Sequence, residues 1–255
     1  MRERSWLPHN WAVARATALL VIRARQGAGG VSEANMPAIT ALVAQLKRRD
    51  RTNVFVDGEF ALGLSNTLAA ELRVGQELTA EDIARLQARD AVEQAYYRTL
   101  NYLSYRPRSV DEITRYLIGK GMTQEVIDQV QARLRRAGLV DDVQFAEFWV
   151  QSRESFRPRG RWALGRELRA KGVAPEVVEA AVAEVDEENG AMRVARKALG
   201  HLAHLDRDTF YRRLLGRLQR RGYGYGVCRH VVDTLWDELH GADADPEQRA
   251  RPDHE

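Results

Sequence analysis

The residues best suited to chemistry in this sequence are arginines that recur in small sets near the middle of the chain. Arg106 and Arg108 are answered by Arg157 and Arg159 at the same spacing, and Arg161 joins the second set. Guanidinium groups form forked, charge-assisted hydrogen bonds to carboxylates and phosphates. Because these cations stand just before or at the start of expected helices, where they oppose the helix dipole, the helices give no reason for them. We interpret all five as contacts to an anionic partner.

A second set of cations stands where helices are expected to end. Lys120 and Lys171 each precede a glycine, and Arg220 and Arg221 repeat that placement before Gly222. A cation in the last turn of a helix complements the dipole by about 0.3–1 kcal/mol, which is a sufficient structural reason for it. We include these four among the candidate partner contacts and leave the structural interpretation open beside it.

The remaining reactive residues do not form a pattern that catalysis or metal binding would need. His201 and His204 are three positions apart, as metal ligands on one helix face can be, but no cysteine or paired carboxylate at ligand spacing accompanies them. The stretch GYGYG at 222–226 follows an expected helix instead of a strand and lacks the Lys-Ser/Thr pair of a phosphate loop. We therefore expect a binding protein without catalytic residues, metal or cofactor.

The stretch that carries most of these cations occurs three times. Residues 106–122 (RPRSVDEITRYLIGKGM), 157–173 (RPRGRWALGRELRAKGV) and 207–223 (RDTFYRRLLGRLQRRGY) share one pattern. Their glycines are 51 and 50 positions apart (172 − 121; 222 − 172), and apolar residues recur at the same offsets. A fixed period of this length indicates stacked supersecondary units, here of three helices each. Stacking in order would align the cations that start the middle helices along one edge.

A β-hairpin is predicted before the repeats. Residues 51–64 (RTNVFVDGEFALGL) alternate apolar side chains around Asp57-Gly58, a pair that supplies the positive φ angles of a type I′ turn. Residues 38–46 (AITALVAQL) are ambiguous between a helix and a third strand. The predicted fold is therefore mainly α, with tandem three-helix repeats in an elongated array, preceded by a small N-terminal segment with a β-hairpin.

These patterns divide the chain into six predicted segments. The first matches nothing later in the sequence, and the last lacks any apolar residue that could anchor it. The segments are residues 1–35, an extension that is disordered or follows a miscalled start codon; 36–88, a hairpin-containing domain; 89–139, 140–188 and 189–240, the three repeats; and 241–255, a disordered tail.

Charge is distributed unevenly along the chain. The net charge is only +3, but residues 104–173 hold 14 Lys and Arg against 9 Asp and Glu, and residues 206–230 hold 7 against 2. Such concentration suits an anionic partner, although solvated helix faces rich in Arg would give the same counts. The single cysteine, Cys228, falls at a core position and fits a reducing compartment. No apolar stretch is long enough to cross a bilayer, so we expect a cytoplasmic protein without membrane contact.

Three further stretches occur in a fixed order: LNYLSYRPRSVDEITRYLIGKG (100–121), GLVDDVQFAEFWV (138–150) and RGRWALGRELRAKGV (159–173). Together they resemble the RecX family, the regulators of the bacterial RecA recombinase, and the resemblance extends over roughly residues 39–239. It implies a protein that lies in the groove of the RecA filament on single-stranded DNA and lowers its ATPase and strand exchange. The expected setting is DNA repair, recombination and the SOS response. The expected protein is a monomer that touches the DNA indirectly or weakly.

Two other classes of function remain as alternatives. A stand-alone DNA-binding protein would use the short helices as helix-turn-helix-like readers of duplex DNA. An enzyme is less well supported, because the repeats leave few polar residues facing inward to converge in a pocket. Trp149 and Trp162 could stack on the bases of single-stranded DNA, although their repeat positions favour the core.

Overall fold

The protein, for which a computed structural model describes residues 36–240, forms two compact units. The first contains the described residues up to Tyr102 together with Met122–Val130. The second contains Leu103–Gly121 and the described residues from Gln131 onward. The predictions made for residues 1–35 and 241–255 lie outside the described residues.

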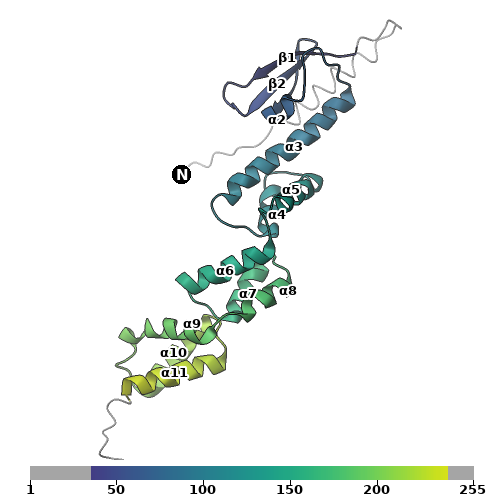
Figure 1. The fold of residues 1–255 in the computed structure, drawn as a ribbon. Coiled ribbons are helices and arrows are strands. Elements are labelled where there is room, and N and C mark those ends of the chain that lie inside the picture. Colours follow the sequence, from purple (N-terminus) through teal and green to yellow (C-terminus); the bar gives the residue numbers. More distant parts are fainter. Residues whose placement is uncertain (1–35, 241–255) are drawn as a thin grey trace, which may run out of the picture. The chain divides into compact units, whose positions relative to one another are not determined.

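A three-stranded antiparallel sheet opens the first unit, in the order β1-β2-β3 (Figure 1). Its strands are β1 (Ile39–Ala44), β2 (Arg51–Val56) and β3 (Glu59–Ser65). Asp57 and Gly58 link the last two with φ angles of 51° and 84°, as the sequence predicted for a tight hairpin. The stretch that was ambiguous between helix and strand is therefore a third strand paired with the hairpin.

One side chain of the hairpin leaves the face on which the alternation placed it. Strict alternation would place Phe60 on the same face as Leu62 and Leu64, which are buried, but Phe60 is 50% exposed. The register shifts between Val54 and Phe55, since Val54 pairs with Leu62 whereas Phe55 pairs with Phe60. A one-residue shift exchanges the two faces of a strand, so Phe60 packs edge-on against Phe55 instead of entering the core.

Two helices cover the apolar side of this sheet, α2 (Asn66–Ala69) and α3 (Ala80–Leu103). α3 is unbroken, so the predicted boundary at residue 88 lies inside a helix, and that boundary stays a prediction. A buried ion pair ties β2 to α3, with Arg51 Nη2 and Asp90 Oδ2 2.8 Å apart. The same carboxylate accepts a hydrogen bond from the backbone N–H of Ser65 at 2.7 Å. The polar groups of this small core are thus satisfied together.

The rest of the described chain is helical and follows the predicted groups of three, with short links between most helices (Figure 1). The fold class is confirmed as mainly α, with tandem three-helix groups after a small sheet. The helices are α4 (Val110–Ile118), α5 (Gln124–Arg136), α6 (Asp142–Phe156), α7 (Arg161–Ala170), α8 (Pro175–Ala183), α9 (Glu187–Arg196), α10 (Arg207–Arg220) and α11 (Tyr225–His240), with a 3₁₀ turn η1 (Leu199–His201) after α9.

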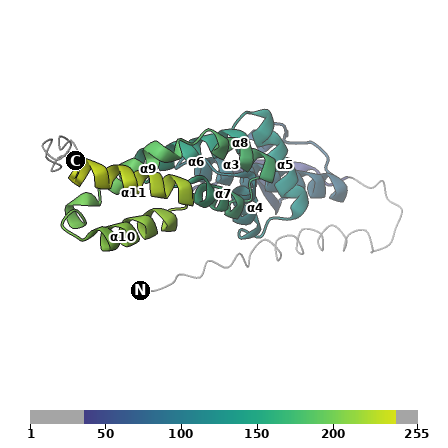
Figure 2. The ribbon, with the colours of Figure 1, turned by 90° about the horizontal axis from the view of Figure 1, so that it is seen from below.

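The apolar positions that set the repeat register form the cores of the repeats in the second unit. Leu164 and Leu168 of α7 are fully buried against α6 and α8, and their equivalents Leu214 and Leu218 of α10 are fully buried in the next repeat. α11 packs along both α9 and α10, as Figure 2 shows. Cys228 lies buried in this last core, as its repeat position predicted. Periodicity therefore identified the buried faces correctly.

Two predictions about side chains in the repeats are wrong. Trp162 is 62% exposed, although we expected it in the core with Leu164. Residues two apart in a helix point to nearly opposite sides, so the burial of Leu164 turns Trp162 toward solvent. His201 ends the short η1 turn and His204 follows it, so the two histidines do not share a helix face.

Candidate functional site

Consecutive repeats of the second unit meet at their middle helices. The C-terminal end of the middle helix of one repeat contacts the N-terminal start of the middle helix of the repeat before it. The first such meeting, which we call the first joint, brings the end of α7 to the start of α4. Ser109 Oγ donates a hydrogen bond to the carbonyl oxygen of Lys171 at 2.6 Å. Gly172, with a φ of 75°, lies so close to Asp111 that a Cβ there would overlap that side chain. Backbone and cap therefore hold the joint together.

The second joint brings the end of α10 to the start of α7 in a similar way. The backbone N–H of Gly160 donates to the carbonyl oxygen of Arg221 at 3.0 Å. A Cβ on Gly160 would overlap the backbone of Gly222, so only glycine fits there. Gly160 stands where Ser109 stands in the first joint, and Arg221 stands where Lys171 stands. The two joints are thus variants of one arrangement.

The first joint neutralises its own cations. The carboxylate of Glu112 receives hydrogen bonds from Arg106 at 2.8 and 2.9 Å and from Lys171 Nζ at 2.6 Å. Burial alone would raise the pKa of Glu112, but the bonds from Arg106 and Lys171 outweigh it and hold that pKa at about 2. Ser109 Oγ accepts a hydrogen bond from the backbone N–H of Glu112 at 3.1 Å and so caps α4, while the Glu112 carboxylate binds the two cations.

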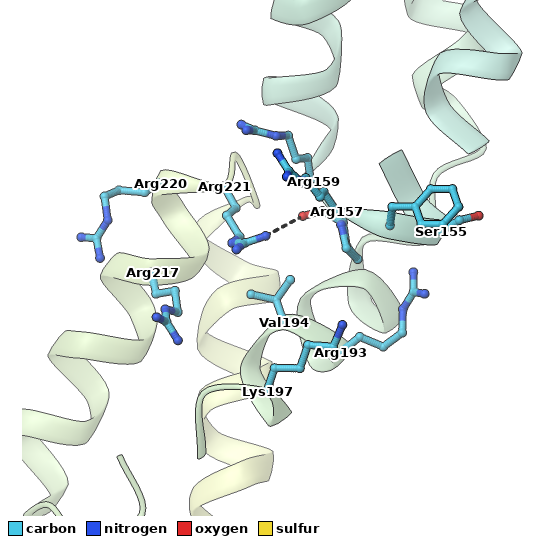
Figure 3. Close-up of a pocket in the computed structure, with 11 residues that line it drawn as sticks. Ser155, Arg157, Arg159, Arg193, Val194, Lys197, Arg217, Arg220 and Arg221 are labelled. Carbon is cyan, nitrogen blue, oxygen red and sulfur yellow. Dashed lines mark hydrogen bonds between the residues drawn. The ribbon is translucent and has the colours of Figure 1, made fainter. Parts of the chain in front are cut away.

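The second joint opens into a cavity of about 470 Å³ lined by cations, which we call the basic hollow (Figure 3). Phe156 lines it and is 80% exposed. No Asp or Glu side chain is among its lining residues, and seven cations are. These cations are Arg157 and Arg159 from the link between α6 and α7, Arg193 and Lys197 from α9 and its C-cap, and Arg217, Arg220 and Arg221 from the end of α10.

Little of this positive charge is neutralised inside the protein. Arg159 Nε lies 3.0 Å from Glu167 Oε1, which gives the hollow its one ion pair among the described residues. Arg193 donates to the carbonyl oxygen of Glu154 at 2.8 Å, and Arg221 donates to that of Pro158 at 3.4 Å (Figure 3). Carbonyl oxygens orient a guanidinium but carry no net charge. The hollow is therefore a concave surface with a strong positive potential, which attracts anions.

The local electrostatics also affect the buried tyrosine that follows the stop glycine of α10. Burial raises the pKa of Tyr223 to about 12, against the opposing effect of Arg221 and Arg193. Its ring belongs to the core of the last repeat. Tyr223 is therefore a neutral core residue at physiological pH, and the cations beside it stay charged without a phenolate partner.

Of the nine residues predicted from sequence as partner contacts, the structure brings four together in the basic hollow: Arg157, Arg159, Arg220 and Arg221. The others lie elsewhere, and their partner contacts stay predictions.

Arg106 and Lys171 are paired with Glu112 in the first joint. Arg108 is half-buried in the link before α4. Lys120 is exposed, with its Nζ 5.5 Å from the centre of the Tyr116 ring.

Arg161 is occupied within its own repeat. Its Nη2 donates to the carbonyl oxygen of Val185 at 3.0 Å, and its backbone N–H donates to Glu187 at 2.8 Å. These bonds hold the start of α7 to the segment after α8. Although Arg161 opposes the helix dipole, its side chain therefore stabilises the packing of its own repeat, which the sequence pattern did not reveal.

Three cations of the basic hollow were missed in the sequence: Arg193, Lys197 and Arg217. The first two lie on α9, whose link to the next helix contains the extra η1 turn, so the repeat offset does not carry over to them. Arg217 could have been found by comparing charges at equivalent positions. The same offset pairs it with Glu167 one repeat earlier (217 − 167 = 50), so the charge is reversed between the two repeats.

Among residues 36–240, no group of three or more His, Cys, Asp or Glu side chains is placed to hold a metal ion. None of the described helices has the length and apolar character needed to span a bilayer. Fold and site together define a protein of tandem three-helix repeats with a cationic hollow at one joint.

Comparison with known proteins identifies the family. The chain belongs to the RecX family. Models of the RecX N-terminal domain and of its first, second and third three-helix domains match residues 37–79, 95–134, 141–182 and 186–232. Relatives are the "Regulatory protein RecX" of Lactobacillus johnsonii, 32% identical over 78% of this chain and 75% of the relative, and that of Bacillus subtilis, 31% identical over 78% of each.

Solved structures support the fold. A crystal structure of regulatory protein RecX is similar with a TM-score of 0.65 and 24% identity, over 78% of this chain and 100% of that one. The crystal structure of RecX from Lactobacillus salivarius has a TM-score of 0.53 and 21% identity, over 57% of this chain and 97% of that one. The chain is thus a regulatory protein of the RecX family with the fold of its relatives.

Proposed function

We propose that this protein binds the RecA filament on single-stranded DNA and lowers its ATPase and strand-exchange activity. The observation that carries the proposal is the basic hollow, which offers seven cations and no carboxylate to an anionic partner. A nucleoprotein filament presents acidic protein surface and phosphates close together, and arginine binds both by forked hydrogen bonds. Membership of a family of regulatory proteins supports a role in binding instead of chemistry.

Inhibition follows from binding if the filament changes shape as it turns over ATP. A ligand shifts an equilibrium only through its different affinities for the two states. A repeat protein that contacts neighbouring subunits in one geometry favours that geometry, and it slows each step that needs another. We place this action in DNA repair and recombination in the cytoplasm, with the protein acting as a monomer.

The test is a titration of the protein into RecA ATPase on single-stranded DNA. Inhibition should grow with protein concentration and level off near stoichiometric binding, and strand exchange should fall in parallel. An ATPase rate unchanged at stoichiometric excess would count against the proposal. Binding to duplex DNA alone with a base preference would instead favour the stand-alone DNA-binding alternative.

A further inference from the structure

We propose that the basic hollow is a site for the phosphodiester backbone of single-stranded nucleic acid, opened by the loss of the carboxylate that closes the first joint. This deepens the proposed function, because it assigns direct contact with the strand to one joint of the repeat array. It differs from the sequence-based expectation that contact with DNA is indirect or weak.

The two joints share their cations but not their anion. Arg106 and Arg157 are equivalent by the repeat offset (157 − 106 = 51), and Lys171 and Arg221 by the next (221 − 171 = 50). Glu112 accepts hydrogen bonds from both cations of the first joint. Its equivalent in the second joint is Ala163 (163 − 112 = 51), whose methyl group can accept nothing.

Further replacements along the middle helix act in the same direction. Glu167 of α7 accepts bonds from Trp149 at 2.8 Å and Arg153 at 2.7 Å and pairs with Arg159 of the hollow, whereas its equivalent on α10 is the cation Arg217. Ala170 corresponds in the same way to Arg220 (220 − 170 = 50). Arg217 and Arg220 both line the basic hollow. The first joint therefore neutralises its cations through Glu112, whereas the second joint has Ala163 in place of that acid and two further cations on α10.

Most cations of the hollow lack a charged partner within the described residues. Apart from Arg159, none of them forms an ion pair with a described residue. Several like charges in one concavity repel one another, so this arrangement gives the fold no stability by itself. The side chains of Arg157, Lys197, Arg217 and Arg220 also have no hydrogen-bond partner within residues 36–240. Release of condensed counterions makes such a surface a good binder of a polyanion, with an affinity that falls as salt rises.

A nucleic-acid strand fits the hollow better than an acidic peptide does, because of Phe156. This ring lines the hollow yet remains 80% exposed, so it has an open face beside the cations. Proteins that bind single strands without sequence preference combine a basic groove with aromatic rings on which bases stack. An acidic peptide would use the cations but give the ring no stacking partner. The bases of a duplex are already stacked on one another and would not reach the ring.

The test restores the missing acids and measures binding of a short fluorescein-labelled oligothymidylate by fluorescence anisotropy. Ala163→Glu recreates the carboxylate of the first joint, and Arg217→Glu recreates the second acid at an exposed helix position that tolerates substitution. Each change should weaken binding at least about tenfold, because it removes or neutralises cations that hold phosphates. Neutralising two phosphate contacts should also reduce the slope of log affinity against log salt by about 1.4.

The control is Arg213→Glu, which makes the same charge change as Arg217→Glu on an exposed part of α10 outside the hollow. It should lower affinity by no more than about twofold through long-range attraction alone. Phe156→Ala should weaken oligonucleotide binding but leave binding of inorganic tripolyphosphate unchanged. Melting curves of all variants establish that they remain folded.

Three outcomes would overturn the proposal. The first is equal binding by the wild type, Ala163→Glu and Arg217→Glu, which would place the strand elsewhere. The second is tight binding of tripolyphosphate without binding of the oligonucleotide, and the third is stronger competition by polyglutamate than by unlabelled oligonucleotide. The assay contains no recombinase, so its failure leaves the ATPase titration unaffected, and inhibition of the ATPase without strand binding would reject only this inference.

Discussion

Replacement of Glu112 by Gln should destabilise the second unit in a way that depends on pH. The folded pKa of about 2, against an ordinary 4.5, corresponds to about 3 kcal/mol of stabilisation at neutral pH. Because the Arg106 side chain is 33% exposed, solvent screens part of this attraction, and we expect a loss of about 2 kcal/mol for Glu112→Gln. A pKa lowered by folding gives stability that is present above the unfolded pKa and lost as pH falls through the folded one.

The measurement is the free energy of unfolding by urea denaturation, for wild type and Glu112→Gln, at several pH values between about 7 and 2. The difference should be constant near neutral pH and shrink as pH falls from 4.5 toward 2. Glu147→Gln, at an exposed position of α6, serves as the control and should stay within about 0.5 kcal/mol of wild type. A difference for Glu112→Gln that does not change with pH would refute the assignment of the stability to its carboxylate.

Three further substitutions test other parts of the structure. Gly160→Ala should cost more than about 2 kcal/mol by pushing α10 away from the second joint, whereas Gly165→Ala, whose new methyl would make only tolerable contacts, should cost far less; thermal melts compare them. Arg51→Leu leaves the carboxylate of Asp90 buried without its ion-pair partner and should cost about 3–5 kcal/mol in urea unfolding. Trp162→Ala should stay within about 0.5 kcal/mol of wild type, because the ring is 62% exposed, and a larger loss would show that it packs in the core.

Features that depend on short stretches of chain could be predicted from the sequence. The hairpin follows from Asp57-Gly58 between alternating apolar residues, and both residues adopt the positive φ angles that the turn needs. The repeat register follows from glycines that end the middle helices, and Leu164 and Leu214 are fully buried at equivalent positions. The hairpin signal is local, and the repeat signal comes from comparing equivalent positions 51 and 50 residues apart (172 − 121; 222 − 172). Neither signal requires knowing which segments of the chain meet.

The electrostatic roles of the cations could not be predicted in this way, because they depend on which repeats meet. The sequence predicted a partner contact at Arg106 but did not reveal that its guanidinium pairs with Glu112, a carboxylate that Lys171 also binds. Arg193 and Lys197 looked unremarkable because the η1 turn changes the spacing between α9 and α10. Pairing between distant segments decided which cations are neutralised. A comparison of equivalent acidic positions, as well as of equivalent cations, would have found part of the answer.

The central claim is that the basic hollow is the surface through which this protein restrains the filament. The most direct measurement compares two double variants of equal charge change in RecA ATPase on single-stranded DNA. Arg157→Glu with Arg220→Glu alters the hollow, whereas Arg212→Glu with Arg213→Glu alters exposed residues of α10 outside it. The account predicts that the first pair raises the half-inhibiting concentration at least about tenfold and that the second changes it little. Equal effects of the two pairs would contradict it.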